Sequence, residues 1–336
     1  MKLHMNLDEH SYDIILERGC LKQLRNYTDV NHKILIISDD NVPREYIDTV
    51  AAQCPECFIH IVKHGEQAKS LHIFEKICDD LLKHHFSRKD KIIALGGGVV
   101  GDLSGYVAAS YMRGIDFIQI PTTTLSQIDS SIGGKVAINF NGVKNVIGAF
   151  YQPKLVLIDP NTLKTLPRRH YINGLVEALK AGLIYDASLF EMFENKDIDR
   201  DIDEIIAKAL AVKKAVVEQD EKEQGLRKIL NFGHTIGHAI EADNHLHDLY
   251  HGECVALGMP YFMSNIQLRE RTQAICKKIG LPSKVPAHHA NWLSVMRNDK
   301  KADHDKIDTV WVHEAGQAVI KQMSLTEIAE LLEDTL

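Results

Sequence analysis

Five histidines lie close together in one segment of the chain, LNFGHTIGHAIEADNHLHDLYHGE. They are His234, His238, His245, His247 and His251. His234 and His238 are four residues apart, so a helix would present both imidazoles on one face. Zinc takes three or four nitrogen, oxygen or sulfur ligands, and a catalytic zinc keeps one position open for water or substrate. We therefore expect a metal or anion site here, with His245 and His247 as surface residues of a polar loop.

The residues around these histidines argue against two common kinds of zinc site. No Glu follows His234, so the HExxH motif of hydrolytic zinc proteases is absent. Structural zinc usually has four filled ligand positions rich in Cys, and none of the six cysteines lies among the histidines. A binding or scaffold protein with a purely structural zinc is therefore the less favoured interpretation.

A second candidate site is the glycine-rich segment from Gly96 to Asp102, which directly follows the apolar run KIIAL. Glycines at a strand-to-helix turn let the backbone approach a phosphate, and the helix N-terminus supplies free N–H groups. The spacing differs from GxGxxG, so tight packing alone is an alternative reason for the glycines. Asp39 and Asn41 follow an earlier strand and could hold a ribose hydroxyl, although an Asp there could instead cap a helix. This pattern indicates a dinucleotide site.

Several cations stand beside glycine, serine and apolar residues, where a charge is costly unless an anion meets it. They are Arg113, Lys135, Lys144 with Asn145, Lys180, Lys213, and Arg227 with Asn231. Solvated surface charge is the alternative for any one of them. Together they favour a small substrate that carries phosphate and carboxylate groups.

The chain of 336 residues exceeds what one hydrophobic core usually holds, which favours two domains. In the first half, short β-branched runs alternate with helical or loop segments, as in βαβ units around a buried parallel sheet. These runs are residues 33–38, 58–62, 91–95, 117–120 and 155–158. We expect an α/β nucleotide-binding domain over residues 1–160.

The second half, residues 161–336, is expected to be a mainly helical metal-binding domain, because apolar residues recur there at spacings of three and four. The predicted helical segments are 174–184, 202–217, 228–242 and 253–268, followed by β-like segments at 309–313 and 318–321 and an acidic helix at 325–335.

Composition and charge exclude several classes of protein. The formal net charge is −7, so nothing attracts nucleic acid or an anionic membrane globally. The first residues lack the apolar core of a signal peptide, and no apolar run is long enough to span a bilayer. We expect a cytoplasmic protein with reduced thiols, in which Cys54 and Cys57 of the single CxxC are ordinary loop thiols.

Longer stretches of the sequence resemble the 3-dehydroquinate synthases, roughly over residues 30–305. They read GGGVVGDLSGYVAASYMRGIDFIQIPTTTLSQIDSSIGGK, KNVIGAFYQPKLVLID, TLP, GLVEALKAGLI, DEKEQGLRKILNFGHTIGHAIE and HGECVALGM. The resemblance implies a dehydroquinate synthase-like fold and conversion of 3-deoxy-D-arabino-heptulosonate 7-phosphate to 3-dehydroquinate and phosphate in the shikimate pathway. It also implies NAD and Zn²⁺ as cofactors, with Co²⁺ as a possible substitute.

The same resemblance implies the residues of each site. Zinc would be bound by Glu177, His234 and His251. NAD would be held by Asp39, Asn41, Glu66, Lys69, Gly97, Gly98, Val99, Asp102, Thr122, Thr123, Leu125, Lys144, Thr165 and Leu166. The substrate would contact Asp129, Lys135, Lys144, Asn145, Lys180, Lys213, Arg227, Asn231, His238 and one of Lys300 and Lys301. Arg113 would reach the neighbouring subunit's site, so a homodimer is implied.

The implied reaction gives these residue types a chemical reason. Zinc would polarise a substrate hydroxyl while NAD takes a hydride, and the resulting ketone would acidify the neighbouring carbon. Phosphate would leave by elimination, with lysines and Asn145 holding the anion and the phosphate oxygens as a plausible base. Return of the hydride, ring opening and an aldol closure would complete the carbocycle.

Some positions depart from the family's usual pattern. Residues 136–140 read VAINF where Thr-Gly-(Val/Ile)-Asn-His is more common, and His170 and Ala181 replace a frequent acidic residue and a frequent Tyr. Another sugar phosphate cyclase is therefore an alternative, but Lys135, Asn145 and His238 remain. A metal-dependent polyol or glycerol dehydrogenase is a second alternative, although it would have no use for so many phosphate-seeking cations and would release NADH.

Overall fold

The computed structural model describes residues 1–243, 248–282, 292–299 and 306–334. The chain divides into two compact units, Met1–Tyr171 and Ile172–Leu336. The boundary predicted at residues 160 and 161 falls shortly before this division, and the domain roles stay predictions. In the described part of the chain, no helix has the length and apolar character that crossing a membrane requires.

The first unit is built around one seven-stranded sheet, in the order β1-β2-β9-β6-β5-β3-β4. Its strands are β1 (Lys2–Met5), β2 (Tyr12–Leu16), β3 (Lys33–Asp39), β4 (Glu56–Val62), β5 (Lys91–Gly96), β6 (Asp116–Pro121) and β9 (Leu155–Ile158). Every pair except β1 with β2 is parallel. The predicted parallel sheet is confirmed, and β1 and β2 are additional strands that the sequence analysis did not predict.

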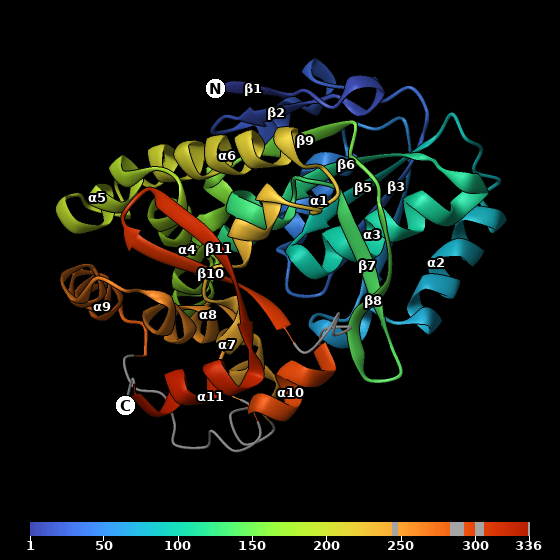
Figure 1. Cartoon of the computed structure of the whole chain (residues 1–336). Helices are drawn as coiled ribbons and strands as arrows, with labels where there is room; N and C mark the ends of the chain where they lie inside the picture. The colour runs from blue at the N-terminus through green and yellow to red at the C-terminus, as the bar shows by residue number, and fades with distance from the viewer. Residues whose placement is uncertain (244–247, 283–291, 300–305, 335–336) are drawn as a thin grey trace. The chain divides into compact units, whose positions relative to one another are not determined.

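The helical segments of this unit connect the strands. They are η1 (Asp8–His10), η2 (Cys20–Asn26), α1 (Arg44–Ala51), η3 (Glu66–Ala68), α2 (Leu71–Lys83), α3 (Gly98–Ser110), η4 (Tyr111–Arg113), η5 (Ser126–Ser130) and η6 (Pro160–Thr165). The chain leaves β3 toward β4 and then returns to the opposite side of β3 to form β5 (Figure 1). This reversal is a topological switch point, where open α/β sheets bind ligands at the carboxyl ends of the strands.

Both faces of the central strands are buried, which explains their nearly continuous apolar sequence. On β3, Leu35 and Ile37 pack into a cluster with α2 and α3, whereas Ile34 and Ile36 pack into a second cluster with η2 and α1. Side chains alternate between the faces because the period of a strand is two. The helices on both faces thus fix the strand ends in place.

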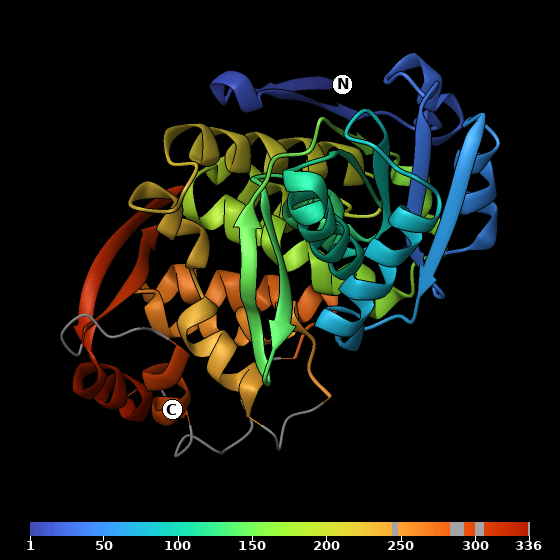
Figure 2. The same ribbon diagram turned by 90° about the vertical axis from the view of Figure 1, so that its right-hand side faces the viewer.

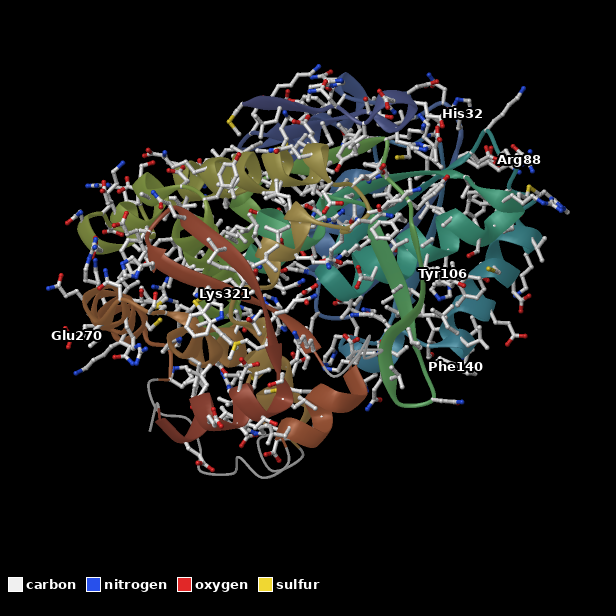
Figure 3. All side chains as sticks on the ribbon, in the orientation of Figure 1. His32, Arg88, Tyr106, Phe140, Glu270 and Lys321 are labelled. Carbon is white, nitrogen blue, oxygen red and sulfur yellow. The ribbon has the colours of Figure 1, made fainter. Side chains whose placement is uncertain are left out.

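Residues 135–150 form a two-stranded hairpin, β7 (Lys135–Phe140) and β8 (Val143–Phe150), and neither strand is among the predicted ones. Asn141 and Gly142 join the strands with φ of 49° and 78°, and Asn-Gly favours the tight turns that need positive φ. Figure 2 shows the hairpin as two long arrows, and Figure 3 labels Phe140 near its turn. Val136 is buried in the apolar cluster of α3, so this departure from the family pattern is a core residue.

Helix α3 and the hairpin approach closely at Gly105. A Cβ at this position would lie 2.3 Å from Val136 Cγ1 and 3.2 Å from Phe117 Cε2. Because both neighbours are buried, the added methyl group has no open space. Gly105 therefore sets the distance between the helix and the hairpin.

Replacing Gly105 with Ala is expected to lower the free energy of unfolding by about 1–2 kcal/mol. Overpacking costs about 1–3 kcal/mol, and the better helix propensity of Ala offsets up to about 1 kcal/mol. We expect the double variant Gly105→Ala with Val136→Ala to lose less free energy of unfolding than the sum of the two single losses. The smaller side chain at position 136 leaves room for the added methyl group. Urea unfolding of the three variants measures this, and strictly additive losses would contradict the close contact.

The second unit is mainly helical, as predicted. Its elements are α4 (Arg168–Ile184, which begins in the first unit), α5 (Ala187–Asn195), α6 (Ile202–Gln219), η7 (Leu226–Asn231), α7 (His234–Ala242), α8 (His251–Gly258), η8 (Met259–Phe262), α9 (Ile266–Ile279), α10 (Trp292–Asp299), α11 (Leu325–Asp334) and the antiparallel pair β10 (Lys306–Glu314) and β11 (Gln317–Ser324). Two predicted segments are wrong as continuous helices. Gly233, with φ of 77°, separates η7 from α7, and Pro260 follows the end of α8.

Helices α7 and α8 pack closely because glycines line their contact. A Cβ on Gly237 would lie 3.0 Å from Val255 Cα, and one on Gly258 would lie 2.3 Å from Gly233 O. Side chains at these positions would force the helices apart. The glycines therefore hold the first half of α7 against the middle and the last residue of α8.

Candidate functional site

One acidic and two basic side chains of the second unit converge at the N-termini of α7 and α8. His234 is the first residue of α7, His251 is the first residue of α8, and Glu177 lies in α4. Glu177 Oε1 lies 3.8 Å from His234 Nε2 and 3.6 Å from His251 Nε2. The three donor atoms lie within 4.8 Å of one another. One carboxylate and two imidazoles are a donor set typical of zinc.

Glu177 is the most unusual group of this cluster. Its side chain is 2% exposed, and neither carboxylate oxygen accepts a hydrogen bond from the residues that the structure describes. A buried carboxylate without hydrogen bonds is costly unless it meets a cation or a metal. Lys180 is such a cation for Oε2, whereas Oε1 faces the two imidazoles and fits the ligand position of a metal ion.

Each histidine is oriented by its second ring nitrogen. His251 Nδ1 lies 2.9 Å from Glu241 Oε2, and His234 Nδ1 lies 3.1 Å from the carbonyl oxygen of Phe232. Such contacts fix the protonated nitrogen and leave Nε2 as the ligand atom. In both residues Nε2 is the nitrogen that faces Glu177.

The local charges shift the pKa values of all three residues. Burial opposes ionisation of Glu177, but Lys180 and the two imidazoles hold its pKa well below the usual range. Burial and the nearby Lys180 hold the pKa of His234 well below its usual value. Burial disfavours the charged form of His251, yet the carboxylates of Glu177 and Glu241 raise its pKa to about 9. The cluster thus contains an ionised carboxylate beside a neutral His234.

Lys180 is the nearest cation to this cluster. It lies one helical turn after Glu177, and its Nζ contacts Glu177 Oε2 in an ion pair. Both side chains are almost fully buried, at 4% and 2% exposed. Removing one partner of such a buried pair leaves the other charge uncompensated.

The other predicted substrate residues of the second unit have varied surroundings. Lys213 in α6 and Arg227 in η7 are buried, and Asn231 Nδ2 donates to Glu223 Oε1 at 3.2 Å. His238 is exposed, and with Glu241 and His251 it forms a second set of possible metal ligands. The predicted residues Lys300 and Lys301, and also His245 and His247, lie outside the described residues.

In the first unit, many of the predicted nucleotide residues lie at the carboxyl ends of β3, β5 and β6. Asp39 ends β3 and Asn41 follows it, Gly97, Gly98 and Val99 follow β5, and Thr122, Thr123 and Leu125 follow β6. Asp39 Oδ1 also accepts the N–H groups of Asn41 and Val42, as a turn-capping residue would. Thr165 Oγ1 lies 3.0 Å from the Tyr46 hydroxyl, and Leu166 is the next residue.

Helix α3 begins at this edge of the sheet without a capping side chain. Gly97 occupies the N-cap position with no side-chain hydrogen bond, in a unit that is described throughout. A Cβ on Gly97 would lie 3.1 Å from Thr123 Cγ2, and one on Gly98 would lie 3.0 Å from Ser130 Oγ. The glycines are therefore needed for close packing, and the helix N-terminus has the N–H groups that favour an anion.

A buried lysine joins several of the predicted residues of the first unit. Lys69 Nζ lies 2.7 Å from Asp102 Oδ2 and 3.5 Å from Glu66 Oε1, and it donates to Asn145 Oδ1. Residues predicted for the nucleotide and for the substrate phosphate thus meet at one cation. Asp129 in η5, Lys135 in β7, Lys144 in β8 and Arg113 in η4 complete the predicted residues of this unit.

Among the unpredicted residues that contact the predicted site residues, Glu241 and Asn139 stand out. Glu241 contacts a predicted metal ligand, and Asn139 contacts both Glu66 and Asn145. Glu241 could have been found from its spacing to His234 and His238 on one helix. Asn139 had no such signal, because its contacts depend on the hairpin.

Comparison with known proteins agrees with this geometry. The family model for the N-terminal part of 3-dehydroquinate synthase matches residues 59–173, and the model for its C-terminal part matches residues 174–302. The chain belongs to the 3-dehydroquinate synthase family. The 3-dehydroquinate synthase of Streptococcus mutans is 42% identical, over 99% of this chain and 100% of the relative. The 3-dehydroquinate synthase of a Picosynechococcus species is 39% identical, over 99% of this chain and 98% of the relative.

Solved structures agree with the dehydroquinate synthase-like fold. A 2-deoxy-scyllo-inosose synthase complexed with carbaglucose-6-phosphate, NAD⁺ and Co²⁺ has a TM-score of 0.88 at 24% identity, with both chains covered completely. The 2-epi-5-epi-valiolone synthase of Streptomyces hygroscopicus subsp. jinggangensis, with NAD⁺ and Zn²⁺ bound, has a TM-score of 0.87 at 26% identity over 98% of each chain. A probable glycerol dehydrogenase from Sinorhizobium meliloti is less similar, with a TM-score of 0.62 at 15% identity. The chain is therefore closer in fold to these cyclases than to that dehydrogenase.

Proposed function

We propose that this protein is a 3-dehydroquinate synthase, which converts 3-deoxy-D-arabino-heptulosonate 7-phosphate to 3-dehydroquinate and phosphate in the shikimate pathway. The observation that carries the proposal is Glu177, a buried carboxylate without hydrogen bonds among the described residues that faces two imidazole nitrogens. Within this family, such a donor set belongs to an NAD- and metal-dependent lyase. Full-length similarity to proteins named 3-dehydroquinate synthase supports the substrate.

Zinc, or Co²⁺ in its place, would be held by Glu177, His234 and His251 in the second unit. NAD would be held at the carboxyl ends of β3, β5 and β6 in the first unit, with its pyrophosphate at the N-terminus of α3. When bound, the metal would polarise a substrate hydroxyl, and NAD would accept a hydride and later return it. These roles assign nucleotide binding to the first unit and metal binding to the second.

The polar residues of both units would then act on the substrate itself. Lys135, Lys144 and Asn145 of the hairpin would hold the phosphate and stabilise it as it leaves. Asp129, Lys180, Lys213, Arg227, Asn231, His238 and one of Lys300 and Lys301 would orient the carboxylate and hydroxyl groups. Holding the ring-opened product in one conformer would favour the intramolecular aldol closure.

The assembly and location are part of the same proposal. Arg113 has a positive φ of 67° and lies on an exposed segment after α3, which suits a side chain that reaches a second copy. We propose a homodimer in which Arg113 completes the neighbouring site. A role in the shikimate pathway and the free cysteines favour a cytoplasmic location.

Phosphate release from 3-deoxy-D-arabino-heptulosonate 7-phosphate tests the function directly. Zinc-loaded protein with NAD should form equal amounts of phosphate and dehydroquinate with no net NADH, and a chelator should abolish the reaction. Turnover of a different sugar phosphate alone would indicate another cyclase. Steady accumulation of NADH from a simple polyol would indicate a dehydrogenase.

Glu241 offers a test of the metal site that does not depend on turnover. Glu241→Ala should weaken zinc binding by about 10- to 100-fold, as loss of a residue behind a metal-ligating His usually does. Glu241→Gln keeps an oxygen that can accept from His251 Nδ1, so it should have a smaller effect. Competition with a chromophoric chelator measures both affinities, and equal zinc binding in wild type and Glu241→Ala would contradict the predicted ligand geometry.

A further inference from the structure

Asn139 lies where the regular pairing of the hairpin is interrupted. The register of β7 and β8 shifts between Ile138 and Phe140, so Asn139 has no regular partner on β8. Irregularities of this kind redirect a side chain and often occur next to active sites. Here the interruption lets Asn139 make contacts with segments that belong to two predicted sites.

On one side, Asn139 is bonded to the segment that carries Glu66 and Lys69. Its Nδ2 donates to Glu66 Oε1 at 2.9 Å, and its backbone N–H donates to the Lys69 carbonyl at 2.8 Å. Asn139 also forms an isolated parallel bridge with Ser70. Backbone and side chain therefore both fix Asn139 to a segment that is predicted to bind the nucleotide.

On the other side, Asn139 holds the residue predicted to bind the substrate phosphate. The backbone N–H of Asn145 donates to Asn139 Oδ1 at 2.9 Å. Asn145 has a φ of 55°, in the left-handed region that Asn adopts more readily than most other residues. The bond from Asn139 holds the backbone in this conformation, and Lys69 holds the Asn145 side chain from the same segment.

We propose that Asn139 is a positioning residue that couples the nucleotide site to the phosphate-binding part of the hairpin. Its amide has two separate tasks: the donor Nδ2 orients Glu66, and the acceptor Oδ1 holds the backbone of Asn145. The inference rests on the proposed function, which identifies the two ligands as NAD and the phosphorylated substrate. It adds a residue that prepares both sites without contacting the reacting atoms.

The two tasks can be separated by substitution. Asn139→Ala removes both, so the Kd for NAD and the KM for the substrate at saturating NAD should each rise by about 2- to 10-fold. Asn139→Asp keeps an oxygen for the Asn145 N–H but places a second carboxylate against Glu66. This variant should weaken NAD binding by about tenfold while the substrate KM stays near that of wild type.

Exchanging the hydrogen-bond donor and acceptor between residues 139 and 66 should restore NAD affinity. On the Glu66→Gln background, the introduced amide can donate to the carboxylate of Asn139→Asp, so Asn139→Asp should cost less NAD affinity there than in wild type. Val143→Thr, on the same hairpin at a position that is 55% exposed, is the matched control and should change neither constant. Calorimetry gives the Kd for NAD without turnover, and phosphate release gives KM.

The outcomes distinguish this inference from the proposed function. Wild-type protein that releases no phosphate from the substrate would contradict the proposed function. On an active wild type, three results would overturn only the role of Asn139: equal KM increases for Asn139→Ala and Asn139→Asp, no dependence on the Glu66 background, or a loss of thermal stability with unchanged Kd and KM.

Discussion

Glu177→Gln is expected to weaken zinc binding by at least about a hundredfold and to reduce turnover to the level of the chelated enzyme. Loss of a residue behind a metal ligand already costs about 10- to 100-fold, and Glu177 is predicted to be a ligand itself. The amide has nearly the shape of the carboxylate, so packing is conserved. What changes is the negative charge between His234 and His251, which the metal requires.

A control distinguishes loss of the metal from loss of the fold. Glu253 is a buried carboxylate of the same unit, and its Oε2 accepts the backbone N–H of Tyr250 at 2.8 Å. Glu253→Gln keeps an oxygen for this cap, so zinc affinity should stay close to that of wild type. Chelator competition and metal analysis after dialysis measure both variants. Zinc retained by Glu177→Gln at wild-type affinity would contradict the ligand assignment.

The second large effect concerns stability. Lys180→Met should lower the free energy of unfolding of the metal-free protein by about 3–5 kcal/mol, because it leaves the buried charge of Glu177 without its nearest cation. Added zinc should restore much of this loss, since a bound metal compensates the same carboxylate. Combining Lys180→Met with Glu177→Gln should also reduce the cost, because no charge then remains unpaired.

Urea unfolding of the chelated and zinc-loaded variants tests this prediction. Lys214→Met removes the partner of Glu218 in an ion pair of 2.7 Å on α6, in which both side chains are 21% exposed, and it should change stability by less than about 1 kcal/mol. If Lys180→Met were no more destabilising than Lys214→Met, Lys180 would not be needed to compensate the buried charge of Glu177. If added zinc left the loss of stability unchanged, this would contradict the prediction that Lys180 and the metal both compensate the charge of Glu177.

The parallel sheet could be predicted because its strands carry their own signal. The runs that became β3, β5 and β9 are apolar on both faces, and that pattern follows directly from burial between two layers of helices. The β7–β8 hairpin could not be predicted in the same way. Its buried residues pack against segments that are distant in the sequence, as in the close contact between Val136 and Gly105.

The metal cluster shows the same division between local and distant signals. His234 and His238 were predicted from helix spacing, and the spacing favoured this pair as donors. In the structure, His234 is instead grouped with His251 and Glu177, while His238 is exposed. Sequence spacing cannot find Glu177, which lies on another helix, and only the resemblance to a family named it. The long predicted helix over 228–242 was wrong for a local reason, because Gly233 takes a left-handed conformation.

The glycine contacts between α7 and α8 have a consequence for metal supply. Because the glycines fix how closely α7 and α8 pack, we expect the ligands that these helices carry to need little rearrangement to accept an ion. Zinc fingers differ, since their folding depends on the metal. If the ligands keep the same geometry for every ion, the relative affinities for different metal ions should follow the intrinsic preferences of nitrogen and oxygen donors. The metal found in cells should therefore vary with growth conditions and with the concentrations of free zinc and cobalt.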